Sequence, residues 1–191
     1  MNDLSLGRRR FALGLPLIAA ACGASPEPNY YTIVPRNGPT LPSGPKVVLL
    51  KDIGLASYLD RREIVRSSES YKLDIRANDW WGEPLAGLIG RVLVVELAQR
   101  LPSSSVYSES GAINVDPNAH VGVNIQRLDA DKAGALVLIA QVAIEFNRPR
   151  RNAARNFTLS KPLPTPNIPG LVAAISDALG ELADGIATLL Q

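Results

Sequence analysis

Apolar residues alternate with polar ones, or form short runs, along much of the chain, as they do in β-strands. Residues 30–34 (YYTIV) are aromatic and β-branched and predict a first strand. Residues 46–53 (KVVLLKDI) are more continuously apolar, which predicts an inner strand that is covered on both faces. Residues 63–67 and 71–75 are expected to pair as an antiparallel hairpin.

Two segments have apolar residues at the three- and four-residue spacing of an amphipathic helix. The first is expected to open at residues 79–84 (DWWGEP), where a proline suits the first turn. Two acidic residues of this opening, Asp79 and Glu83, suit the positive end of the helix dipole. Pro102 ends this helix, and the second helix covers about residues 168–190.

Strand patterns return between the two helices, at residues 103–108, 120–129 and 133–146. Turn-forming residues between the last two predict a second hairpin. A shorter strand is expected at 154–161, after a basic turn at 148–152. These elements predict an α/β fold with a mixed β-sheet and two main amphipathic helices. No repeat is visible, so a solenoid is not indicated.

The first residues have the layout of a secretory signal. Three arginines at positions 8–10 precede eleven uncharged residues, and this run ends in three alanines followed by Cys22, the single cysteine of the chain. The run is too short for a membrane span, which takes about 20 helical residues. Residues 23–29 (GASPEPN) are small, polar and proline-bearing and predict a short tether. We therefore expect a signal at 1–22 and one domain at 30–191.

The position of Cys22 directly after Ala19–Ala21 resembles the lipobox of bacterial lipoproteins, in which the cysteine becomes an acylated N-terminus. Several acyl chains on one residue hold a protein stably on a bilayer. The alternative is an incidental thiol behind an ordinary cleaved signal. Residues 7–13 also resemble a twin-arginine export signal, although an ordinary basic signal explains them equally well. Gly23 in place of aspartate favours sorting to the outer membrane.

Composition excludes several classes of function. Without the signal the chain has 17 basic and 17 acidic side chains, so the +2 net charge of the whole sequence comes from the signal. No basic excess is left to indicate nucleic-acid binding. His120 is the only histidine, and the sequence has no G-x-S-x-G motif, no phosphate-binding loop and no calcium loop. We expect no catalysis, no cofactor and no metal.

Three stretches in sequence order resemble one known family. They are residues 30–33 (YYTI), 58–66 (YLDRREIVR) and 80–85 (WWGEPL), the last leading into the first helix. Together with the lipobox they resemble the ABC-type transport auxiliary lipoproteins, over nearly the whole chain. The resemblance implies a three-layer sandwich similar to anticodon-binding and TolB N-terminal domains.

The same resemblance implies a function and partners. It implies a non-catalytic, outer-membrane-anchored lipoprotein on the periplasmic face, accessory to an ABC system that carries lipids between membranes. The implied partners are a mammalian-cell-entry (MCE) protein, whose conduit this protein would receive, and the permease and ATPase of the same system. A homo-oligomeric ring is also implied. Two other classes stay open: a structural or assembly lipoprotein of the envelope, and a carrier that holds an acyl chain between helix and sheet.

Two sequence neighbourhoods supply candidate interface residues. Trp80 and Trp81 are adjacent, so their side chains point in different directions and cannot both enter one core layer. Tyr58, Asp60 and Arg61 lie in the second neighbourhood, and tryptophan, tyrosine and arginine are enriched in interface hot spots. These residues are expected to contribute to self-association or to docking a transport partner, or else to pack a loop over the sheet.

Overall fold

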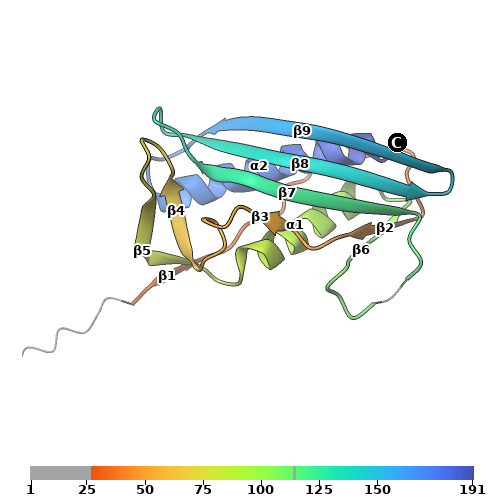
Figure 1. Ribbon diagram of the computed structural model, residues 1–191, viewed down its shortest axis with the longest axis horizontal. Helices are drawn as coiled ribbons and strands as arrows, with labels where there is room; N and C mark the ends of the chain where they lie inside the picture. The colour runs from red at the N-terminus through yellow and green to blue at the C-terminus, as the bar shows by residue number, and fades with distance from the viewer. Residues whose placement is uncertain (1–26, 114) are drawn as a thin grey trace, which may run out of the picture.

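The computed structural model describes residues 27–113 and 115–191. The predicted signal, the proposed acylation site Cys22 and most of the predicted tether lie outside these residues. The described part contains a nine-stranded mixed sheet and two helices, so the predicted α/β sandwich with a mixed sheet and two main helices is confirmed (Figure 1).

The sheet combines parallel and antiparallel pairs. The order along its main path is β1-β5-β4-β7-β2-β6, while β3 pairs with β7, and β8 lies between β7 and β9. The pairs β4–β5, β7–β8 and β8–β9 are antiparallel, and the others are parallel. The elements are β1 (Asn29–Tyr31), β2 (Val47–Leu50), β3 (Gly54–Leu55), β4 (Glu63–Ser67), β5 (Asp74–Trp81), α1 (Leu85–Arg100), β6 (Ser105–Ser108), β7 (Ala119–Ala130), β8 (Ala135–Asn147), β9 (Arg150–Pro162) and α2 (Ile168–Leu189).

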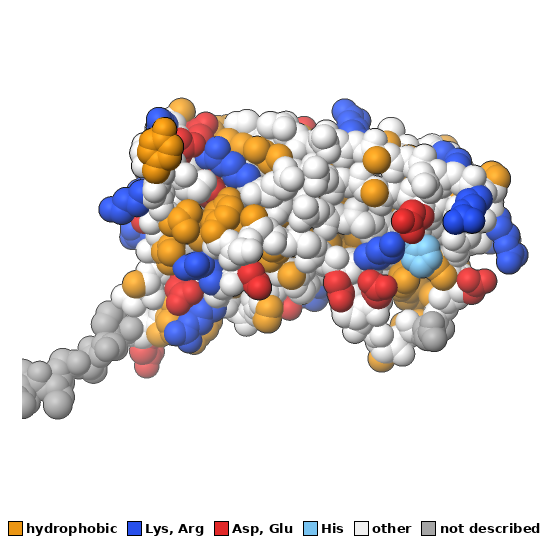
Figure 2. Space-filling view, viewed as in Figure 1, with side chains coloured by type: hydrophobic (Ala, Val, Ile, Leu, Met, Phe, Trp, Pro, Cys, Tyr) orange, Lys and Arg blue, Asp and Glu red, His pale blue; other side chains and the backbone are white. Residues whose placement is uncertain are grey.

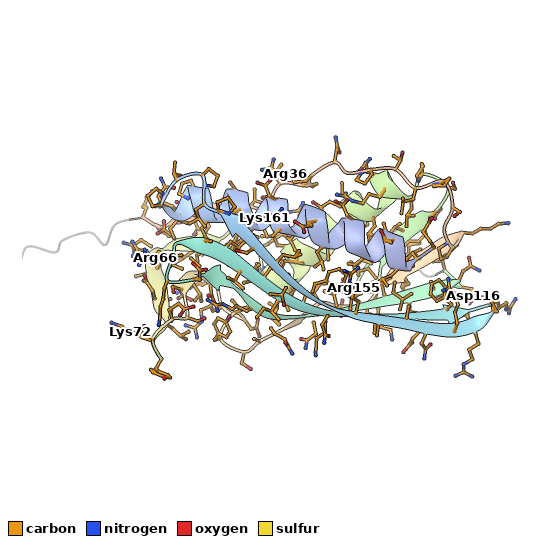
Figure 3. All side chains as sticks on the ribbon, turned by 90° about the horizontal axis from the view of Figure 1, so that it is seen from above. Arg36, Arg66, Lys72, Asp116, Arg155 and Lys161 are labelled. Atoms are coloured by element: carbon orange, nitrogen blue, oxygen red, sulfur yellow. The ribbon has the colours of Figure 1, made fainter. Side chains whose placement is uncertain are left out.

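Both helices pack on one face of the sheet (Figure 3). Along β8 every second side chain from Leu136 to Phe146 is buried against them, and the intervening side chains face away. The second helix opens at Asn167, whose side chain accepts a hydrogen bond from the Gly170 N–H at 2.9 Å. Its apolar stripe, which includes Leu171 and Leu179, lies in the core, so the sheet and the helices share one hydrophobic interior.

Residues 32–46, here called the strap, connect β1 to β2 without regular structure, as four prolines in 35–45 predict. The strap crosses the outer side of the helix pair, where Figure 3 labels Arg36. The Arg36 N–H donates to Glu96 Oε1 of α1 at 2.8 Å, and its guanidinium pairs with Asp177 of α2 at 2.7 Å. The strap therefore ties both helices together from the side opposite the sheet.

The start of the first helix differs from the prediction. Strand β5 covers Asp74–Trp81 instead of residues 71–75, so Asp79 lies in a strand. The reason is a parallel partner far away in sequence, since β1 pairs along the last three residues of β5. The helix begins at Leu85 behind Pro84, with no acidic residue in its first turn, and Glu83 instead binds Arg91 at 2.6 Å.

Two other strands also differ from the prediction. Strand β2 is only four residues long and buries alternate side chains, because the helices cover a single face of the sheet. Strand β9 spans 13 residues instead of residues 154–161, because it pairs along all of β8. The sequence hides the early part of β9, which begins RRNAARN, because an edge strand can carry polar side chains on both faces.

Candidate functional site

The candidate interface residues gather at one end of the molecule, where the described chain begins and where β1 meets the β4–β5 hairpin (Figure 1). We call this end, formed by β1, the hairpin and the loop at residues 56–62, the tether end. The tip of the β8–β9 hairpin lies at the opposite end (Figure 1). The long strands β7, β8 and β9 join the two ends of the molecule.

Trp80 and Trp81 are the last two residues of β5, so the pleat of the strand sends their side chains to opposite faces. Trp81 is only 6% exposed and belongs to the core. Trp80 is partly exposed and packs edge-to-face on Tyr30, with ring centroids 5.9 Å apart. The Arg62 guanidinium lies 4.0 Å from the centre of the Trp80 ring. Trp80, Tyr30 and Arg62 therefore form one exposed cluster.

The Tyr58 side chain is hydrogen-bonded to a buried residue of the sheet. Its hydroxyl donates to Oδ2 of the fully buried Asp129 at 2.7 Å, and the Arg127 Nε donates to the other oxygen of Asp129 at 3.0 Å. Arg127 also pairs with Glu69 on the β4–β5 connection at 2.7 Å. Burial and the bond to Asp129 raise the pKa of Tyr58, so it stays a donor. This network holds the loop and the hairpin on β7.

Asp60 and Arg61 lie on the outer side of the same loop. Asp60 is exposed, and the partly exposed Arg61 donates from Nε to the Tyr58 carbonyl at 2.9 Å. The five candidate residues thus lie near each other, but some make buried contacts and others face solvent. Tyr58 and Trp81 make buried contacts, whereas Asp60, Arg61 and Trp80 present polar or aromatic atoms to solvent.

The β4–β5 hairpin was predicted, but its second strand begins at Asp74, so Tyr71 lies in the turn. Ser70 and Tyr71 have φ values of 58° and 62°, in the left-handed region, and the Lys72 N–H closes the turn on the Glu69 carbonyl at 3.2 Å. Tyr71 is fully exposed. Seven large hydrophobic side chains are exposed in the described part, and four of them lie at the tether end: Tyr30, Tyr71, Leu73 and Ile75. Exposed apolar side chains are therefore concentrated there, together with basic ones (Figure 2).

Residues 27–113 and 115–191 contain no group of three or more His, Cys, Asp or Glu side chains that could hold a metal ion. Neither helix of this part of the chain is long and apolar enough to cross a bilayer. His120 is the second residue of β7, partly exposed and opposite Glu145 in the strand register. It lies near a strand end, and although the side chain is partly exposed, its Nδ1 is buried without a hydrogen-bond partner within the described residues.

A family model described as "ABC-type transport auxiliary lipoprotein component" matches residues 31–187. The chain belongs to this family. The resemblance seen in the sequence is confirmed, and the auxiliary lipoprotein is thereby related to ABC-type transport. No curated protein matches its sequence.

Two solved structures share the fold of the auxiliary lipoprotein. A crystal structure of an uncharacterized protein has a TM-score of 0.74 at 17% identity, covering 87% of this chain and 100% of that chain. Protein XCC0632 from Xanthomonas campestris, of the DUF330 family, has a TM-score of 0.69 at 17% identity, covering 84% and 94%. At this identity the likeness concerns the fold alone.

The three motif stretches of the auxiliary lipoprotein meet at the tether end. The first becomes β1, the second contains Tyr58 and continues into β4, and the third closes β5 and opens α1. They come together through the β1–β5 and β4–β5 pairs, and the Tyr58 bond to Asp129 holds the second stretch on β7. The motifs are therefore parts of one assembled region, not three separate sites.

Proposed function

We propose that this protein is an outer-membrane lipoprotein of the periplasmic face and a non-catalytic component of an ABC/MCE lipid transport system. The signal ends before Cys22, which is acylated, and residues 23–29 tether the domain; export uses the twin-arginine or the general route. The observation that carries the proposal is a family match that begins at residue 31, nine residues after the lipobox cysteine. The partners are an MCE protein and the permease and ATPase of its system.

The outer face of β7, β8 and β9 supports a role in docking the MCE conduit. Two rows of residues cross these strands in register: Gly122, Ala143 and Ala154 in one, and Asn124, Gln141 and Asn156 in the other. All six residues are small or uncharged. Figure 2 looks onto this face, and its middle is largely free of charged side chains. Interface centres are depleted of charge, so we assign the MCE contact to this face.

We further propose that copies of the protein form a closed ring. A ring uses two different surfaces of each copy and leaves none of them unpaired. The loop that carries Asp60 and Arg61 offers one such surface, supported from below by the buried contacts of Tyr58 and Trp81. The edge of β9, which pairs only with β8 within the described residues, offers another.

Affinity capture from the cell envelope tests this function. The tagged protein with Cys22 intact should retain an MCE protein and elute as an oligomer. The Cys22→Ala variant should be absent from the membrane fraction. Ala143→Arg puts a charge in the middle of the docking face and should abolish capture of the MCE protein. Ala98→Arg on the exposed side of α1 is the matched control and should leave capture unchanged. Equal capture by both variants would contradict the assignment of the face.

The two alternative functions give different results in the same experiment. An assembly lipoprotein would retain other outer-membrane proteins and no MCE protein. An acyl-chain carrier would retain lipid after delipidation of the anchor. Ile125, Leu138 and Leu179 are fully buried between the sheet and the helices, so an acyl chain could enter there only if these side chains moved apart. We therefore favour docking over carriage.

A further inference from the structure

We propose that the tether end lies on the lipid surface to which the protein is anchored, with Tyr30, Tyr71 and Trp80 in the headgroup region. This inference rests on the acylation of Cys22 proposed above. It assigns a ligand, the bilayer surface, to a region that the family match leaves without one. It also fixes the orientation of the domain, since the opposite end then points away from the bilayer.

The length of chain between the anchor and the fold supports this orientation. Six residues lie between Cys22 and Asn29, the first residue of β1, and the seven steps from one to the other span at most about 25 Å. The end that contains β1 is therefore held near the bilayer. Figure 3 shows Arg66 and Lys72 at this end, whereas Arg155 and Asp116 lie toward the other.

The exposed side chains at this end have the chemistry of a membrane interface. Tyr30 is 65% exposed and Tyr71 is fully exposed, and Trp80 lies beside Tyr30. Tyrosine and tryptophan are enriched at bilayer surfaces because they combine an apolar ring with a polar group. Arg62 on the Trp80 ring and Lys72 beside Tyr71 can place apolar stems among the headgroups with their charges in water.

The backbone conformation of the hairpin tip is energetically unfavourable, and the Tyr71 side chain makes no contact that would stabilise the fold. Two central residues with positive φ usually call for Asn-Gly, but here they are Ser70 and Tyr71. A non-glycine residue in this region costs about 1–3 kcal/mol. Because the Tyr71 ring is fully exposed, no packing offsets that cost. The turn serves to project an aromatic ring from the end of the molecule.

Charge and shape favour a lipid surface over a protein at this site. Arg66 pairs with Asp74, and Arg76 lies near both Asp74 and Asp79, so these basic side chains are already matched within the hairpin. Insertion of aromatic rings, rather than attraction to anionic lipid, then dominates the contact. The tip projects beside the turn between β7 and β8 (Figure 1), and a fluid headgroup layer accepts such projections without a preformed pocket.

Dye labelling of the acylated protein in phosphatidylcholine vesicles tests the contact. After acylation of Cys22 the chain has no other cysteine, so Tyr71→Cys accepts a polarity-sensitive maleimide dye at one position. Arg150→Cys, at the opposite end, is the matched control, and both positions are exposed. We expect a blue shift of the Tyr71→Cys emission on reconstitution and no shift for Arg150→Cys. No shift in either protein, or the same shift in both, would overturn the inference.

The two tryptophans provide a second readout that needs no label. Trp81→Phe leaves only the partly exposed Trp80, and Trp80→Phe leaves only the buried Trp81. In vesicles with brominated acyl chains, the emission of Trp80 should be strongly quenched and that of Trp81 much less. Equal quenching would contradict the inference.

Failure of the inference can be distinguished from failure of the proposed function. A protein that does not float with vesicles has no acyl anchor, and this result would contradict both the proposed function and the lipid contact. A protein that floats but shows neither the blue shift nor the quenching keeps its proposed function and loses only the lipid contact. A blue shift that appears only after an MCE protein is added would also overturn the inference, because Tyr71 would then contact that protein and not lipid.

Discussion

Arg100 of α1 donates from Nε to Oδ1 of Asp184 of α2 at 2.6 Å, from a position that is only 1% exposed. The same guanidinium donates to the carbonyls of Arg36, Glu96 and Gly180 at 2.9 to 3.1 Å. One buried cation thus connects the strap and both helices. Each of its three nitrogens donates at least one hydrogen bond, which makes its burial tolerable.

Replacing Arg100 by Met should therefore destabilise the fold strongly. The change leaves the three carbonyls without this donor and removes the link to Asp184, and leaving buried acceptors unpaired costs about 1–3 kcal/mol. The free energy of unfolding in urea measures the loss. Arg91→Met on the same helix is the matched control, because its pair with Glu83 is exposed and is worth about 1 kcal/mol or less. Equal losses would contradict the role given to Arg100.

Glu96 should make stability depend on pH. It is 1% exposed with Oε2 unpartnered, and burial raises its pKa to about 7 although the Arg36 N–H and Arg100 oppose the rise and Asp184 adds to it. Because the pKa in the folded protein lies above the ordinary glutamate value of 4.5, the stabilisation is full below about pH 4.5 and is lost as the pH rises from there through 7.

Glu96→Gln tests this dependence, because the amide keeps the shape of the protonated acid. At pH 8 the variant should be more stable than the native protein by about 3 kcal/mol, and at pH 4 the two should be similar. Urea unfolding at both pH values measures the difference. A variant that is less stable than the native protein at pH 8 would show that Glu96 is needed as an anion.

Tyr58→Phe should destabilise the protein by about 1–3 kcal/mol, because the buried Asp129 loses a hydrogen-bond donor. Hydrogen exchange should also rise in β4 and in the loop at residues 56–62. Tyr30→Phe, at an exposed ring, is the control and should change stability little. Unchanged exchange in the loop of Tyr58→Phe would mean that this network does not hold the tether end.

Replacing Ser70-Tyr71 by Asn-Gly should stabilise the protein by about 1 kcal/mol or more, because both new residues accept positive φ. Thermal unfolding measures this gain. The same change should weaken the vesicle contact, since it removes the Tyr71 ring. A loss of stability would mean that the ring packs on the fold after all.

Local patterns predicted the elements that alternate or repeat clearly. The β4 strand, the β7–β8 hairpin and both helices follow the predicted spacing, because one side of each packs on a single core. The patterns failed where a distant partner decides the structure. Residues 79–81 form a strand because they pair with β1. The first residues of β9 form a strand because they pair with β8.

The candidate site shows the same division. The adjacency of Trp80 and Trp81 predicted that they face apart, and they do. The inward bond of Tyr58 could not be predicted, because its partner Asp129 lies 71 residues away. The sequence pattern placed Tyr71 in a strand instead of the turn, because a hairpin turn with positive φ is usually indicated by glycine or asparagine, and this turn has neither.

The intact mass of the protein extracted from the cell envelope tests the central claim most directly. The account predicts a chain that begins at Cys22, with its mass increased by a diacylglyceryl group on sulfur and an acyl chain on the new N-terminus. A chain that begins at another residue, or at Cys22 with an unmodified thiol, would contradict it.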